Sequence, residues 1–106
     1  MTKLFLAILV LASMFIASFA LAGEDPLAKL KSGQKKPVAA LIDRMVYCNH
    51  WQGEEPYDAD RAKEINSAIL ELRCGALDKD EASILKRYKS DSKLKDTLRA
   101  AKDFSI

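Results

Sequence analysis

The chain has 106 residues, and its 17 lysines and arginines nearly balance its 15 aspartates and glutamates, giving a formal net charge of +2. A chain of this length supports one small domain with a modest hydrophobic core. The near-neutral balance argues against nucleic-acid binding, because a protein that neutralises phosphates presents a strongly basic surface. The composition therefore favours a single small domain with no nucleic-acid partner.

Residues 1–22 predict a secretory signal peptide. Lys3 gives a short positive start, and an apolar run follows that ends in Ala20-Leu21-Ala22. A signal peptidase accepts small side chains at the first and third positions before the cut. The apolar run is also close to the length that crosses a bilayer, so a retained anchor is the alternative. Cleavage would give a periplasmic or secreted protein without stable membrane insertion.

The segment that follows is polar. Residues 23–36 contain Pro26, Gly33 and four lysines. This composition is typical of a flexible lead-in rather than of a packed element. We therefore expect the folded domain to occupy residues 37–106.

The domain is predicted to open with an amphipathic helix. Pro37 suits the first turn of a helix, where its missing N–H is not needed. Apolar residues then recur at three- and four-residue spacing to about residue 50. Residues 51–57 contain Gly53 and Pro56 and are predicted to form a connecting loop.

Three further helices are expected after this loop. Their starts are marked by residues that cap helices, namely Asp58 or Asp60, the capping-box spacing at residues 78–81, and Ser90 or Asp91. Gly75 is placed to end the second helix in a left-handed conformation. No segment alternates polar and apolar residues as a strand does. The predicted fold class is all-α, a compact domain of about four short helices.

Two cysteines, Cys48 and Cys74, remain in the exported chain. An even count in an oxidising compartment favours one intramolecular disulfide. In a tight antiparallel hairpin, the second helix would carry Cys74 about 20 Å away from Cys48. A disulfide tolerates a Cα separation of only about 7 Å. We therefore expect the loop 51–57 to run back along the first helix as a packed strap, with the second helix crossed or near-parallel.

A metal site is the alternative use of these cysteines. Cys48, His50 and Cys74 have the thiolate and imidazole groups that bind zinc or copper(I). They supply only three donors, and none of the usual paired spacings is present. We expect no metal and no other cofactor.

The segment from Cys48 to Asp58 contains the only histidine and the only tryptophan of the chain. One interpretation is structural: Trp51 and Tyr57 cover the helices, and Asp58 caps the second one. The other is a binding surface that faces a basic cleft or a cell-envelope component. Its candidate binding residues are Trp51, Glu54, Glu55, Tyr57 and Asp58.

Catalysis is not expected in this segment. His50 would be the base, with Glu54 or Glu55 as its acid or orienting partner. No serine or cysteine nucleophile lies in a recognisable motif, and Cys48 is predicted to be oxidised.

A basic stretch near the end of the sequence is formed by Lys86, Arg87, Lys89, Lys93 and Lys95. Asp91 and Asp96 interrupt it. We expect two solvated helix faces here, and weak binding of an anionic lipid or cell-wall polymer is the alternative.

The loop sequence Cys48-x-His50-Trp51-x-Gly53-Glu54-Glu55-Pro56-Tyr57-Asp58 resembles a group of small exported bacterial proteins of uncharacterised function. Other residues share in the resemblance: Arg61, Glu64, Ile65, Arg73-Cys74, Leu77-Asp78-x-Asp80-Glu81 and Arg87-Tyr88. It implies a periplasmic or secreted bacterial protein in which Cys48 and Cys74 are paired. It implies no known activity, so no catalytic residue follows from it.

The expected function is that of a binding or accessory protein of the bacterial cell envelope, not an enzyme. The sequence leaves two alternatives open, a periplasmic zinc- or copper-binding protein and an inhibitor of an envelope enzyme such as a lysozyme. Small periplasmic lysozyme inhibitors are similar in type, being helical and disulfide-linked, but their cysteine pattern does not align with this one. The oligomeric state is left open.

Overall fold

The computed structural model describes residues 25–106, so the predicted signal peptide and its cleavage site lie outside the described residues. Residues 25–106 form five α-helices and one short 3-10 helix, and this range contains no strand. The prediction of an all-α domain is confirmed, with one helix more than expected. In chain order, the elements are α1 (Pro26–Lys31), α2 (Lys36–Gln52), α3 (Ala59–Glu71), η1 (Cys74–Ala76), α4 (Leu77–Arg87) and α5 (Leu94–Lys102).

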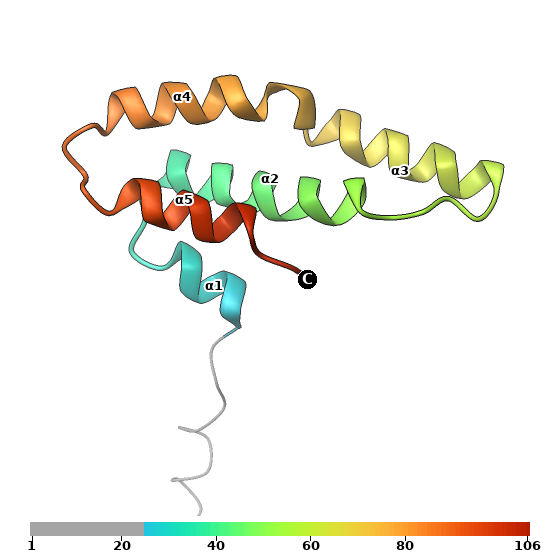
Figure 1. The fold of residues 1–106 in the computed structure, drawn as a ribbon, viewed down its shortest axis with the longest axis horizontal. Helices are drawn as coiled ribbons and strands as arrows, with labels where there is room; N and C mark the ends of the chain where they lie inside the picture. The colour runs from blue at the N-terminus through green and yellow to red at the C-terminus, as the bar shows by residue number, and fades with distance from the viewer. Residues whose placement is uncertain (1–24) are drawn as a thin grey trace, which may run out of the picture.

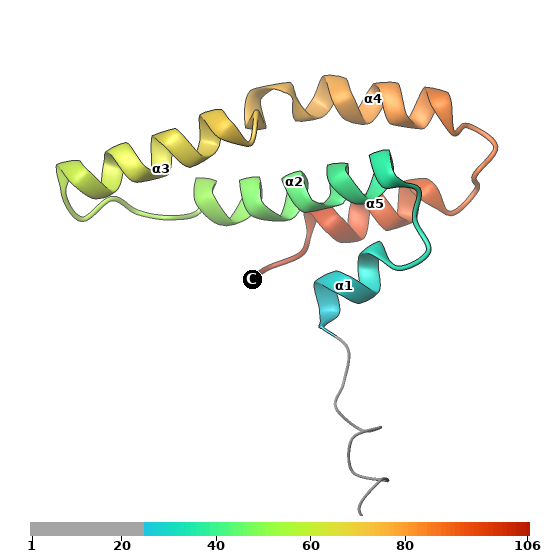
Figure 2. The same cartoon turned by 180° about the vertical axis from the view of Figure 1, so that it is seen from behind.

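Helix α2 is the central element of the fold (Figures 1 and 2). The helices α3 and α4 follow one another in a broken row antiparallel to α2, while α5 and α1 lie on its other side. The predicted apolar spacing of α2 explains this position, because it provides buried side chains that pack against several neighbouring helices. They are Val38, Leu41, Ile42, Met45, Val46 and Cys48.

The hydrophobic core joins α1, α2 and α5, and α4 packs against it from the side. Leu94, Leu98 and Ala101 of α5 are all at most 2% exposed, as expected for a stripe at three- and four-residue spacing. By contrast, α3 buries only Ile65. Helix α4 buries no residue fully, but Leu77, Ile84 and Leu85 pack against the core, whereas no residue of α3 does. Helix α3 is therefore held least by the core.

Helix α1 corrects the prediction of a flexible lead-in for residues 26–31. The side chain of Asp25 accepts a hydrogen bond from the N–H of Ala28 at 3.3 Å, and Pro26 occupies the first turn. Leu27 is 7% exposed and belongs to the core, and Leu30 packs against it. Lys31 adds an ion pair to Asp43 of α2 at 2.9 Å. Two leucines three residues apart are enough to dock one short helix, although the surrounding composition is that of a linker.

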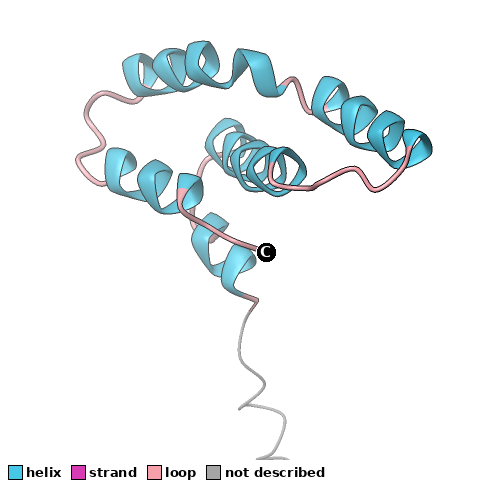
Figure 3. Ribbon diagram, turned by 45° about the vertical axis from the view of Figure 1, so that its right-hand side comes forward, coloured by secondary structure: helices cyan, strands magenta, loops and turns pink. Residues whose placement is uncertain are grey.

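The predicted disulfide between Cys48 and Cys74 is present, with a Cα–Cα distance of 5.6 Å. The expected path of the chain between the two cysteines is wrong. Residues 53–58 do not run back along α2 but continue beyond its end, and α3 then returns antiparallel to it (Figures 1 and 3). An extended segment of this length reaches about 20 Å, and a 13-residue helix retraces about the same distance. The outward loop therefore allows an antiparallel α3 to bring Cys74 back to Cys48.

The starts of the helices follow the predicted caps only in part. Asp58 accepts a hydrogen bond from the N–H of Arg61 at 2.7 Å and caps α3, as predicted. At α4 no side chain caps the first turn, because η1 leads directly into the helix and places Asp78 inside it. Asp91 accepts from the N–H of Lys93 at 3.0 Å, in the turn that precedes α5.

Candidate functional site

The candidate binding residues lie where α2 ends and α3 begins. Helix α2 continues two residues beyond the predicted end, so Trp51 stands on its last turn. The N–H of Gly53 donates to the carbonyl oxygens of Asn49 and His50, both at 3.2 Å, and closes the helix. Residues 53–58, here called the 53–58 loop, then lead to the Asp58 cap of α3. Both ends of the loop are thus fixed by hydrogen bonds to a helix terminus.

Arg61, on the first turn of α3, connects the two ends of the 53–58 loop. Its Nη1 lies 3.0 Å from Glu64 Oε1, and its Nη2 lies 3.4 Å from Glu54 Oε2. The guanidinium carbon lies 5.2 Å from the centre of the Trp51 ring, within cation–π range. Hydrogen bonds to Glu64 and then Glu54 raise the pKa of Arg61 above its ordinary value. The cation therefore holds the last turn of α2, the loop and α3 together.

Glu54 faces inward rather than outward. Besides Arg61, it approaches His50, whose Nε2 lies 3.5 Å from Glu54 Oε1. The His50 ring in turn meets Trp51 edge to face, with centroids 5.4 Å apart. Trp51 is half-buried between His50 and Arg61. These two of the five candidate residues are thus part of the internal structure of the site.

Glu55 and Tyr57 are the candidate residues that the structure leaves exposed. Tyr57 has 80% of its surface accessible, the largest value among the exposed large apolar residues of the described chain. Glu55 is exposed beside it in sequence. Asp58 is also exposed but uses its carboxylate to cap α3. The five predicted residues therefore separate into an inward pair, an outward pair and a cap.

The C-terminal tail contributes to the site, although no sequence pattern predicts it. The side chain of Asn49 donates a hydrogen bond to the carbonyl oxygen of Phe104 at 2.9 Å. A hollow of about 260 Å³ lies next to this bond, and its lining includes His50, Glu54, Ser105 and Ile106. The tail follows the last helix and has no periodicity of its own, so no sequence pattern indicates this contact.

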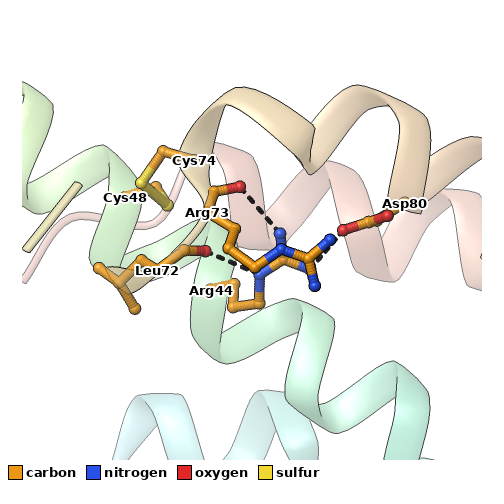
Figure 4. The surroundings of a disulfide bond; sticks show 6 residues. All are labelled: Arg44, Cys48, Leu72, Arg73, Cys74 and Asp80. Atoms are coloured by element: carbon orange, nitrogen blue, oxygen red, sulfur yellow. Dashed lines mark hydrogen bonds and ion pairs between the residues drawn. A yellow bond between two sulfur atoms is a disulfide. The ribbon is translucent and has the colours of Figure 1, made fainter. Parts of the chain in front are cut away.

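Arg44 is a second residue that sequence reasoning missed, and it lies beside the disulfide (Figure 4). Its Nε and Nη2 each donate at 2.9 Å, to the carbonyl oxygens of Leu72 and Arg73 respectively. Its Nη1 lies 2.7 Å from Asp80 Oδ2. The hydrogen bond from Arg44 lowers the pKa of Asp80 below its ordinary value. We call this group the Arg44 clamp, because it binds the end of α3 and the start of α4 to α2.

The Arg44 clamp accompanies an unusual backbone conformation. Arg73 has a φ of +54° and adopts the left-handed conformation that the sequence analysis expected at Gly75. Its carbonyl oxygen, with that of Leu72, is held by Arg44. Arg44 precedes Cys48 by four residues and so shares its face of α2. That spacing is the signal by which the clamp could have been predicted.

The sulfurs of Cys48 and Cys74 are bonded to each other, so neither offers a thiolate to a metal. No group of three His, Cys, Asp or Glu residues that could hold a metal ion occurs within residues 25–106. His50 lies beside Glu54, a candidate for its catalytic partner. Among the described residues, no hydrogen bond joins His50 to a serine that could act as a nucleophile. Over the same range, no helix is both long enough and apolar enough to span a bilayer.

Comparison with protein-family models, with curated proteins and with solved structures finds no match to this chain. The resemblance of the 48–58 segment to small exported bacterial proteins therefore stays a prediction.

Proposed function

We propose that this chain is an exported, non-catalytic binding or accessory protein of the bacterial cell envelope, and that it binds its partner through the 53–58 loop. One observation carries the proposal: Tyr57, the most exposed aromatic side chain of residues 25–106, lies on a loop that is fixed at both ends. An aromatic ring in this position contributes little to the core, whereas aromatic side chains are frequent anchors of protein interfaces.

The rigidity of the loop supports a binding role. The helix caps, Arg61 and the disulfide restrict the loop before any partner arrives. Binding a partner then costs less conformational entropy than it would for a free loop. The surface therefore has the physical properties of a preorganised docking tip.

The charge of the tip indicates the chemistry of the partner. Residues 53–64 contain five acidic and two basic side chains, a net charge of −3. Such a surface is complementary to a basic cleft and would speed association with it. An inhibitor of an envelope enzyme with a basic active-site cleft is one form that this function takes.

Affinity capture from an envelope extract tests the proposal. We expect the protein to retain a defined partner that the double variant Glu55→Lys/Tyr57→Ala loses, by about tenfold or more in captured amount. The matched control is Tyr47→Ala, which removes a 40% exposed tyrosine of α2. Equal capture by the tip variant and the control would refute the 53–58 loop as the binding surface.

Export is tested separately by the mass of the protein purified from the periplasm. The disulfide supports an oxidising compartment, where such bonds persist. We expect a mature chain that begins at Gly23, with no thiol that reacts with an alkylating reagent before reduction. A retained N-terminus or two free thiols would contradict this part of the proposal.

A further inference from the structure

The end of the molecule opposite the 53–58 loop is strongly basic. Residues 84–99 contain six lysines and arginines against two aspartates, a net charge of +4. The turn between α4 and α5, which lies within this range, is at the far end of the molecule from the 53–58 loop (Figure 1). The small net charge of the whole chain therefore conceals two ends of opposite sign.

A hollow of about 560 Å³ lies between α4 and α5 at this basic end. Its lining includes the cations Lys86, Lys89 and Lys95 together with the apolar or aromatic residues Leu85 and Tyr88. We call it the α4–α5 groove.

The three lysines of the α4–α5 groove have no ion-pair partner among the described residues. By contrast, Lys31 and Lys102 each pair with a carboxylate. Asp91 also lines the groove and offsets one of these charges, so the lining residues carry a net charge of +2. The clustered cations repel one another, and an anion in the groove would relieve that repulsion.

A fourth lysine reaches the same end from another part of the chain. The Nζ of Lys35, just before α2, lies 4.4 Å from the centre of the Tyr88 ring. The guanidinium of Arg87 lies 5.3 Å from the same ring. Two cations thus lie near the ring of Tyr88, which is partly buried against the core, and an amphipathic ring of this kind prefers a lipid–water interface.

From these observations we propose that the α4–α5 groove docks the protein reversibly on an anionic phospholipid surface. The lysines would contact lipid phosphates, and Leu85 and Tyr88 would lie at the level of the headgroups. Leu85 and Tyr88 pack against the core with part of their surface, and a lipid would cover the part that stays accessible in the groove, whereas a dissolved anion would not. This proposal does not depend on the function proposed for the 53–58 loop.

Vesicle co-sedimentation tests the proposal. We expect the purified protein to bind vesicles that contain phosphatidylglycerol and not to bind vesicles of phosphatidylcholine alone. High salt should release the bound protein. The triple variant Lys86→Gln/Lys89→Gln/Lys95→Gln should bind about a hundredfold more weakly, because each lysine near an anionic surface contributes about fivefold. All three residues are on or near the surface, so far-ultraviolet circular dichroism should show the wild-type helix content.

The matched control is Lys29→Gln/Lys63→Gln/Lys79→Gln, which removes the same charge from exposed positions outside the groove. We expect it to weaken binding by less than about threefold. Equal weakening by the two triple variants would overturn the assignment to the groove, as would equal binding to both kinds of vesicle. A further experiment adds inorganic phosphate to the vesicle-bound protein and measures its release, with sodium chloride of the same ionic strength as the comparison. Specific release by phosphate would show that the groove binds a dissolved anion instead of a lipid surface.

Discussion

Arg61 and Trp51 form the contact on which the local structure of the 53–58 loop depends. The guanidinium covers the indole ring, and its two Nη atoms bind Glu54 and Glu64. Its Nε is buried without a hydrogen-bond partner among the described residues. The position of Arg61 is therefore set by Trp51 and the two carboxylates. Removing the ring would leave the cation without its stacking surface.

Replacing Trp51 by Ala should lower the free energy of unfolding by about 2 kcal/mol. A fully buried Trp costs about 3 to 5 kcal/mol when truncated, and this ring is half-buried. Urea denaturation measures the change, and Tyr57→Ala is the control, with an expected loss below about 0.5 kcal/mol. Equal losses in the two variants would contradict the inward position of Trp51.

The pair of Arg44 and Asp80 predicts a dependence of stability on pH. The lowered pKa of Asp80 means that its carboxylate stabilises the fold fully above the ordinary Asp value of 3.8. This contribution is lost as the pH falls through the lowered pKa of the folded state. Asp80→Asn should therefore be less stable than the wild type at neutral pH, and the difference should shrink at more acidic pH.

Urea midpoints at a series of pH values from neutral to strongly acidic test this expectation. Asp96→Asn is the control, because Asp96 is exposed and has no ion pair among the described residues. A stability difference for Asp80→Asn that stays constant with pH would show that the ion pair with Arg44 is not its source.

Arg73 offers a substitution that should stabilise the protein. The backbone of Arg73 is left-handed, a conformation that destabilises any residue with a Cβ by about 1 kcal/mol. Glycine adopts this conformation without that cost. The carbonyl oxygens bound by Arg44 belong to the backbone, so Arg73→Gly retains them. We expect a gain of about 0.5 to 1 kcal/mol in thermal or urea unfolding. Arg99→Gly, in the middle of α5, should instead lose about 1 kcal/mol.

At the scale of elements, α3 depends on the disulfide more than any other helix does. It buries only Ile65 and leaves Leu70 76% exposed. The disulfide closes a 26-residue separation, which is worth about 3 to 4 kcal/mol in the entropic description. The double variant Cys48→Ser/Cys74→Ser should lose about this much stability. Amide hydrogen exchange should show a greater loss of protection in α3 than in α2 and α5, and equal losses would contradict the dependence.

The helices with regular apolar spacing could be predicted from the sequence, and so could the pairing of the cysteines. The spacing in α2 and α5 is a local property that survives in the folded structure. Helix α1 escaped prediction because Leu27 and Leu30 stand among lysines. Leu27 is buried, and Leu30 partly buried, only because the core of α2 and α5 lies beside them. Likewise, Glu54 and Glu55 look equivalent in the sequence. Their difference arises from Arg61, which contacts Glu54 across the loop.

The direction of α3 was not predictable from the distance between the cysteines alone. The residues between Cys48 and Cys74 can bring the two sulfurs together in two ways. The loop can run back along α2, or it can first extend beyond the end of α2 so that α3 returns. The choice depends on the caps at Gly53 and Asp58, which set the directions in which the chain leaves α2 and enters α3. Local hydrogen bonds thus decided a feature of the whole topology.

At the scale of the whole molecule, the acidic 53–58 loop and the turn between α4 and α5 lie at opposite ends (Figure 1). The basic α4–α5 groove lies at this turn. A molecule whose two ends carry opposite charge is oriented by the electric field of a charged surface, so that the end of opposite sign approaches the surface first. A protein docked on anionic lipid through the groove would hold Tyr57 away from that surface. The two proposed surfaces are therefore compatible with simultaneous use.

The disulfide has a consequence for proteolysis, since it encloses the exposed 53–58 loop. A protease that cuts within this loop would divide the polypeptide into two pieces that remain covalently joined. The nicked protein would migrate as a single band on a gel without reductant and separate into two fragments once a thiol is added. A cut in this exposed loop would thus leave the two halves of the protein joined in one molecule.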